Sequence, residues 1–272
     1  MRSSKAYKNL QFLNSPEARP MRILSEFLEP RKRFRDEGIR DTIVVFGSAR
    51  ILPRRSTKLR LAALRHKYRL SKSLSLKARD EIRQAETDYE ISQYYDDAVE
   101  LAYLMTKWSK TRRNGKHFVI CSGGGPGIME AANRGAMKAG GPSIGLNVSL
   151  PFEQDCNNYI TPSLNFEFHY FFMRKFWFVY LAKALIMFPG GYGTLDELME
   201  VLTLVQTGKV KKKLPIVLYG RKYWEEILNV KSLVKYKMIS ERDLKLFRYA
   251  DTPQEAFEYL KKELTRLYLR RA

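Results

Sequence analysis

Short apolar runs alternate with longer amphipathic stretches along the chain from about residue 41 onward. Runs rich in β-branched residues that end at glycine or proline are typical of strands buried on both faces of a sheet. We predict five such strands, in DTIVVFGSAR (41–50), HFVICS (117–122), SIGLNVSL (143–150), ALIMF (184–188) and LPIVLYG (214–220). Because helical stretches separate them, the pattern indicates an α/β fold with a doubly wound parallel sheet and helices on both faces.

The stretches between these strands show the three- and four-residue apolar spacing of helices. The clearest example comprises Ile91, Tyr94, Tyr95, Ala98, Leu101, Ala102 and Met105. Residues 151–165 have the composition of a loop. The predicted helices cover 56–113, the segment from Gly127 to Gly140, Phe166–Ala182, Thr194–Gln206 and a last segment from about Pro253.

The first 40 residues differ in character from the rest of the chain. They are polar and basic, contain three prolines, and offer only Met21–Leu28 as a short helix. We interpret 1–40 as an N-terminal extension and 41–272 as a single domain with a basic helical insert at about 50–85. A length of 272 residues suits this arrangement.

Charge is distributed unevenly, and the net value is +20. Between Arg50 and Arg79 there are eleven Lys or Arg residues and no Asp or Glu. Such a block can bind nucleic acid or an anionic membrane surface. The other interpretation is a solvated helical face, which we favour because only His66 and Tyr68 offer rings on which bases could stack.

Several classes of protein are excluded by what the sequence lacks. No apolar run approaches the roughly 18–20 residues of a membrane span, and no apolar secretory segment begins the chain. The two cysteines, Cys121 and Cys156, have no metal-binding or redox spacing. We therefore expect a cytoplasmic protein with no membrane partner and no bound metal.

Three of the predicted strands end in loops of small residues, which are Gly47-Ser48, Ser122–Gly127 and Gly190–Thr194. The carboxyl ends of parallel strands meet at one edge of the sheet, where ligands bind. A glycine loop that opens a helix presents free backbone amides and the positive end of the helix dipole, which suits an anion. The three loops together predict a phosphate-bearing ligand rather than three unrelated turns.

Two common phosphate motifs do not match these loops. The segment GGGPGIME has Ile128 where the dinucleotide fingerprint requires its last glycine. The acidic residue expected about twenty positions later is also missing, because Leu150 and Pro151 occupy that region. Neither loop ends in the Gly-Lys-Ser/Thr of a P-loop. We expect neither a nicotinamide dinucleotide nor any other cofactor.

The segments GSAR, SGGGPGIMEAANRGA, GLNVSLPFEQ, MRK and PGGYGTLDELME together resemble the LOG (Lonely Guy) family of nucleoside 5′-monophosphate phosphoribohydrolases, many of which are labelled lysine decarboxylase. The match covers roughly 41–220 and continues more weakly to about 265. The resemblance implies a Rossmann-like nucleotide-binding domain, a homodimer or larger assembly, and no redox cofactor. It also implies hydrolysis of AMP or cytokinin ribotides to free base and ribose 5-phosphate. The extension and the insert resemble longer bacterial members, in which preference for a prenylated base is less secure.

The resemblance assigns the catalytic arginine to Arg174 and the catalytic glutamate to Glu197. A carboxylate beside ribose can stabilise the positive charge that develops at C1′ and can deprotonate water. The phosphate ligands that we predict are Gly190, Gly191, Gly193, Thr194, Ser48, Gly123, Gly124 and Gly125. The ribose or base contacts that we predict are Glu200, Glu130, Asn133 and Lys175.

Each assignment has a structural alternative. Thr194 and Glu197 fit the S/T-x-x-E capping box, so Glu197 has a second interpretation as a helix cap. Arg174 lies among aromatic residues and should be paired if buried, with Glu197 or a substrate oxygen as its partner. His169 is a weaker candidate for the acid that protonates the leaving base.

Three other functions stay open at this point. A protein of the same fold could bind nucleotide without cleaving it. The basic insert could bind nucleic acid, although a nucleoside monophosphate is the partner that we expect. A pyridoxal-dependent decarboxylase has only Lys175 and Lys183 near the loops as candidate lysines.

Overall fold

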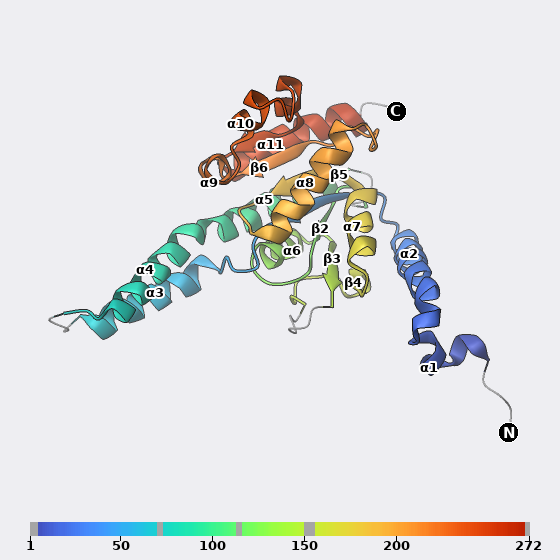
Figure 1. The fold of residues 1–272 in the computed structure, drawn as a ribbon, viewed down its shortest axis with the longest axis horizontal. Coiled ribbons are helices and arrows are strands. Elements are labelled where there is room, and N and C mark those ends of the chain that lie inside the picture. Colours follow the sequence, from blue (N-terminus) through green and yellow to red (C-terminus); the bar gives the residue numbers. More distant parts are fainter. Residues whose placement is uncertain (1–4, 70–72, 113–115, 150–155, 270–272) are drawn as a thin grey trace.

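The computed structural model describes residues 5–69, 73–112, 116–149 and 156–269. Within them, seven strands form one sheet in the order β4-β3-β2-β1-β5-β6-β7, and every neighbouring pair is parallel (Figure 1). The strands are β1 (Thr42–Phe46), β2 (Val119–Ser122), β3 (Ser143–Val148), β4 (Asn165–Phe168), β5 (Ala182–Met187), β6 (Ile216–Tyr219) and β7 (Arg248–Ala250). The predicted doubly wound α/β fold is confirmed.

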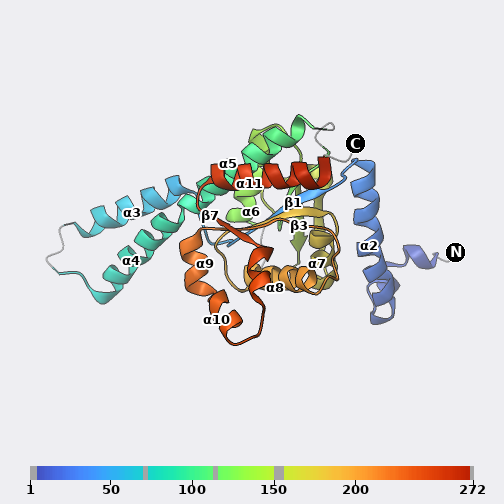
Figure 2. The same cartoon turned by 90° about the horizontal axis from the view of Figure 1, so that it is seen from above.

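Helices cover both faces of the sheet (Figure 2), and alternate residues of the central strand β1 belong to two separate cores. Ile43 and Val45 point to one core, whereas Val44 and Phe46 point to the other. The helices on the first face are α5 (Gln93–Lys110), α6 (Ile128–Lys138) and α11 (Pro253–Leu264). Those on the second face are α2 (Arg19–Asp36), α7 (Phe171–Tyr180), α8 (Tyr192–Gln206) and α9 (Arg221–Ile227).

Two strands at the edges of the sheet were not predicted. The start of the predicted helix Phe166–Ala182 is wrong, because β4 (Asn165–Phe168) pairs there with β3 and buries Phe166 and Phe168. The strand β7 has only three residues, too few to show a period. The predicted end of the third strand at residue 150 and the first five residues of the predicted loop, 151–155, lie outside the described residues.

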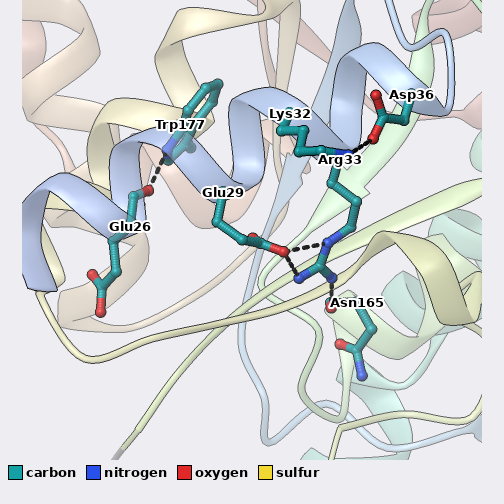
Figure 3. A network of polar contacts seen from close by, with 7 residues as sticks. All are labelled: Glu26, Glu29, Lys32, Arg33, Asp36, Asn165 and Trp177. Carbon is teal, nitrogen blue, oxygen red and sulfur yellow. Dashed lines mark hydrogen bonds and ion pairs between the residues drawn. The ribbon is translucent and has the colours of Figure 1, made fainter. Parts of the chain in front are cut away.

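The helix near the N-terminus is much longer than the predicted Met21–Leu28, since α2 runs over Arg19–Asp36. It lies against α7 and β4 through the contacts drawn in Figure 3. The indole Nε1 of Trp177 donates to the carbonyl of Glu26 over 3.0 Å, and Arg33 Nη1 donates to the carbonyl of Asn165 over 2.7 Å. The apolar face of this helix therefore completes the second core.

Between β1 and β2 the chain forms a helical hairpin that extends away from the sheet (Figures 1 and 2). Its two arms are α3 (Arg54–Tyr68) and α4 (Leu76–Ile91), and α4 leads into α5 through Ser92. The remaining α-helices are α1 (Leu10–Leu13) and α10 (Val230–Lys235). None of the helices in the described ranges has the length and hydropathy needed to cross a membrane.

Candidate functional site at the carboxyl edge of the sheet

The three glycine-containing loops meet at the carboxyl edge of the sheet, and Ser48 joins them. The Ser48 amide donates to the carbonyl of Pro189 over 2.9 Å, which ties the loop after β1 to the loop after β5. The Ser48 carbonyl accepts from the amide of Ile128 over 3.1 Å, which ties the loop after β1 to the start of α6. The predicted convergence is therefore confirmed.

Close packing explains several of the glycines in these loops. A Cβ at Gly127, where φ is +69°, would lie 2.4 Å from the carbonyl oxygen of Ser48. A Cβ at Gly190 would lie 2.1 Å from Oγ1 of Thr194 and 3.1 Å from the amide of Ser48. Gly191 and Gly193 differ, because a Cβ at either position would meet nothing within 4 Å. Packing within the chain does not require glycine at these two positions.

The first turn of α8 presents unpaired backbone amides. The helix begins at Tyr192 after Gly191, whose φ of −84° and ψ of −152° are extended, and no side chain caps it. Among the described residues, no hydrogen-bond acceptor contacts the amides of Tyr192, Gly193 or Thr194, and the first paired amide is that of Leu195. Free amides at the positive end of a helix dipole form a site suited to an anion.

The capping-box interpretation of Glu197 is wrong. Because α8 starts two residues before Thr194, Glu197 lies in its second turn, too far along to reach the N-cap amide. The side chain is only 5% exposed, and Oε2 has no hydrogen-bond partner among the described residues. Burial raises the pKa of Glu197 to about 7, although the charges of Lys175 and Arg174 oppose that rise.

Arg174 extends from α7 into the same region and is largely buried. Its Nε donates to the carbonyl of Leu146 on β3 over 2.8 Å, which fixes the guanidinium beneath the loops. A Cβ at Gly123 would lie 2.6 Å from Arg174 Nη2, so the guanidinium touches the glycine loop directly. Burial lowers the pKa of Arg174, whereas the charge of Glu197 raises it. Of the two partners expected for Arg174, Glu197 or a substrate oxygen, Glu197 forms no ion pair with it among the described residues.

Lys175 and Glu200 pair with each other on the rim next to Glu197. Lys175 Nζ lies 2.8 Å from Glu200 Oε2 and 2.6 Å from Asp196 Oδ2. Both carboxylates lie within the first three turns of α8, so this cluster links the middle of α7 to α8. Lys175 and Glu200 are therefore present at the site as neutralised charges.

Glu130 and Asn133 lie on α6 and already have partners. Glu130 Oε1 accepts a hydrogen bond from the hydroxyl of Tyr95 on α5. Asn133 is fully buried, and its amide group bonds to Ser122, Asn157 and the carbonyl of Ile144. Asn133 thus supports the glycine loop from below and does not face its open side.

Sequence reasoning missed three residues at this edge. Asn157 Nδ2 donates to the carbonyls of Gly124 and Gly125 and holds the glycine loop in place. The hydroxyl of Tyr223 donates to the carbonyl of Gly190 over 2.6 Å. Tyr192 is 94% exposed on the first turn of α8, and its place between two glycines was the one available signal.

His169, the weaker candidate for the acid, is exposed, and its backbone amide donates a hydrogen bond to Glu26 of α2.

Two further features of the structure bear on ligands. No group of three or more His, Cys, Asp or Glu side chains in the described ranges is placed to hold a metal ion. An apolar pocket of about 260 Å³ lies between α8 and the segment that follows α9. Its lining residues Met199, Leu202 and Gln206 lie on the side of α8 opposite to Glu197, so the pocket is separate from the glycine loops.

Comparison with known families gives one match. Residues 129–260 match the family described as "Possible lysine decarboxylase". An uncharacterized protein of Archaeoglobus fulgidus is 32% identical over 113 residues, which is 40% of this chain and 70% of that protein.

Solved structures of similar topology have low sequence identity. The molybdenum cofactor binding protein of Rippkaea orientalis is 20% identical, with 63% of this chain and 88% of that chain covered and a TM-score of 0.45. The Moco carrier protein of Chlamydomonas reinhardtii is 18% identical, with 84% and 99% covered and a TM-score of 0.47.

Proposed function

The chain belongs to the LOG family, also described as possible lysine decarboxylases, and from this premise we propose that it hydrolyses the N-glycosidic bond of purine nucleoside 5′-monophosphates. The products are free base and ribose 5-phosphate. AMP is the simplest substrate of this class, and cytokinin ribotides carry the same ribose 5-phosphate.

One observation carries the proposal, namely the buried carboxyl of Glu197 with its unpartnered Oε2 at the carboxyl edge of the sheet. A buried polar atom without a partner costs free energy, so it persists where it serves a ligand. A perturbed carboxyl pKa beside a largely buried arginine is typical of functional sites.

The phosphate of the substrate binds to the free amides of Tyr192, Gly193 and Thr194. These amides lie one to two turns from Glu197 on the same helix, so ribose fits between the phosphate and the carboxyl. The open space at Gly191 and Gly193 leaves room for the phosphate oxygens to approach the backbone. Tyr192 offers an exposed ring to the base.

The proposed mechanism depends on the positive charge that develops on ribose as the N-glycosidic bond breaks. As the bond from C1′ to the purine nitrogen lengthens, its electron pair leaves with the base and positive charge develops on C1′ and the ring oxygen. The ionised Glu197 stabilises that charge and accepts a proton from the water that bonds to C1′. The departing nitrogen takes up a proton from solvent, and Glu197 releases its proton to solvent before the next turnover, so the reaction consumes one water. Arg174, held by Leu146, orients the substrate against the glycine loop.

Lysine decarboxylation by a pyridoxal cofactor is disfavoured by the two candidate lysines. Lys175 is engaged by two carboxylates. Lys183 lies at the start of β5, hence at the amino edge of the sheet, with its ammonium 4.8 Å from the centre of the Tyr268 ring. Neither is a free amine at the glycine loops, where the ligand would bind.

The test is incubation of the full chain with AMP and chromatographic detection of adenine and ribose 5-phosphate. Replacing Glu197→Gln keeps the shape of the side chain and should lower turnover by about a hundredfold or more. Glu226→Gln, an exposed carboxyl on α9, is the matched control and should retain full activity. Tight AMP binding in calorimetry with no release of adenine by the wild type would instead indicate a nucleotide-binding protein.

A further inference from the structure

The hairpin formed by α3 and α4 has one face without counter-charges. Arg55, Lys58, His66 and Arg69 are all exposed, with Ala62 among them. With Ala62 included, each position is three or four residues from the next, which places all of them on a single side of α3 and its C-cap. No carboxylate of the described chain lies within ion-pairing distance of these four side chains. We call this set the outer stripe.

Three other cations of α3 pair with carboxylates of α4, whereas Arg54 lies over the ring of Tyr89. Arg60 lies 2.9 Å from Asp88, Arg65 lies 2.7 Å from Glu86, and Lys67 lies 4.0 Å from Glu81. Between these flanks, Thr57 and Leu61 are buried against the partner helix. The carboxylates of α4 thus pair with cations on the sides of α3 and leave the outer stripe without carboxylate partners.

The stripe is long, straight and accessible. Arg55 and Arg69 are fourteen residues apart, which at a helical rise of 1.5 Å per residue is about 21 Å. The hairpin extends from the body of the protein, as both views of the fold show (Figures 1 and 2). The stripe can therefore contact a large partner that the sheet and its loops do not touch.

We propose that the outer stripe of α3 binds the phosphate backbone of a nucleic-acid duplex. Regularly spaced Arg and Lys side chains on a rigid helix match the regular phosphates of a duplex, and a helix fits within its major groove. Single strands are bound through stacked aromatic rings, and the outer stripe contains none besides His66. The cations of the stripe are Arg55, Lys58 and Arg69, so its contacts are to phosphates and are independent of sequence.

Two other partners fit the stripe less well. A membrane-binding helix buries an apolar face opposite its cations, but the opposite face of α3 is buried by α4, and Leu59 is the exposed large apolar residue beside the stripe. A second copy of the chain would place like charges against each other.

The experiment measures binding of the full chain to a labelled DNA duplex and to an RNA duplex by fluorescence anisotropy at several salt concentrations. The test variant combines Arg55→Gln, Lys58→Gln and Arg69→Gln. The control variant combines Lys209→Gln, Lys211→Gln and Lys231→Gln, which removes the same charge from other exposed positions. Circular dichroism and thermal unfolding establish that both variants are folded. Because anisotropy measures duplex binding and not hydrolysis, the result does not depend on the proposed hydrolase activity.

We expect the wild type and the control variant to bind duplex with affinities that fall steeply with salt. The test variant should bind about tenfold or more weakly, and the slope of log affinity against log salt should become shallower by about two to three, one unit per lost phosphate contact. Equal losses in the test and control variants would overturn the proposal, because they would indicate diffuse net charge. Absence of duplex binding would also overturn it, as would binding only to phosphatidylserine vesicles.

Discussion

Arg174 and Glu197 lie close enough for each charge to shift the pKa of the other, yet no ion pair joins them. Arg174 Nε donates a hydrogen bond to the carbonyl of Leu146, and Glu197 Oε2 has no hydrogen-bond partner among the described residues. A buried pair in direct contact would neutralise both charges and close the space between them. The absence of an ion pair leaves both groups available to the proposed substrate.

The pH dependence of hydrolysis should follow the ionisation of Glu197. The proposed mechanism needs the carboxylate, and burial raises the pKa of this group to about 7, so kcat/KM should increase as the pH rises through about 7. Lys175 lowers this pKa, and Lys175→Gln should therefore move the midpoint to higher pH. The substrate phosphate also titrates, but the substrate is the same for the wild type and for Lys175→Gln. A difference between their pH profiles therefore comes from a group of the enzyme. Identical midpoints would contradict the assignment.

The free energy of unfolding should also depend on the ionisation of Glu197, but it should fall over the pH range in which kcat/KM rises. The pKa is raised in the folded state from 4.5 to about 7, so the folded protein holds this proton more tightly than the unfolded chain. The wild type therefore loses free energy of unfolding as the pH rises from about 4.5 to about 7. Glu197→Gln removes this loss and should stabilise the protein by about 1–3 kcal/mol near pH 8 and by little near pH 4. Urea unfolding across this range measures the difference, and parallel curves would refute the burial argument.

Gly193→Ala should separate stability from substrate binding. A methyl group at this position meets nothing in the free protein, and alanine favours the helix, so the free energy of unfolding should rise by up to about 1 kcal/mol. The same methyl group occupies the space proposed for the phosphate, so KM for AMP should rise. Chemical unfolding and initial-rate kinetics give the two values. An unchanged KM would place the phosphate elsewhere.

Gly123→Ala should displace the guanidinium of Arg174. The new Cβ would lie 2.6 Å from Arg174 Nη2 and 2.6 Å from Met129 Sδ, and both atoms lie near the ends of flexible side chains. The fold should therefore survive with a loss of about 1 kcal/mol, while kcat falls about tenfold or more. Thermal unfolding together with kcat distinguishes this outcome from simple misfolding. Normal turnover would mean that the position of Arg174 is not critical.

The centre of the sheet could be predicted from the sequence because its strands are buried on both faces. Burial on both faces leaves a continuous apolar run, as in β1, and the glycine loops mark where such strands end. The edge strands β4 and β7 could not be predicted, because they lack such a continuous apolar run. In β4, exposed Glu167 interrupts the apolar run, and the aromatic residues of α7 follow so soon that strand and helix merge into one pattern.

The glycine loops and their convergence could be predicted, but the role of Glu197 in the helix could not. Apolar periodicity does not fix the first residue of a helix, and the capping-box pattern placed the start of α8 two residues too late. The burial of Glu197 and the contact between Arg174 and Gly123 depend on how α7 packs against α8 and the sheet. The functions of these residues stay predictions that the variants above test.

The position of β1 at the centre of the sheet has a consequence for synthesis of the protein. Val44 pairs with Leu185, which the ribosome adds about 140 residues later. Until β5 is made, β1 has an open edge and the core beneath α2 lacks α8 and α9. A contact of such sequence separation forms slowly. The nascent chain therefore passes through a stage that has four paired strands and no Glu197, and a chaperone that shields that open edge would favour correct assembly.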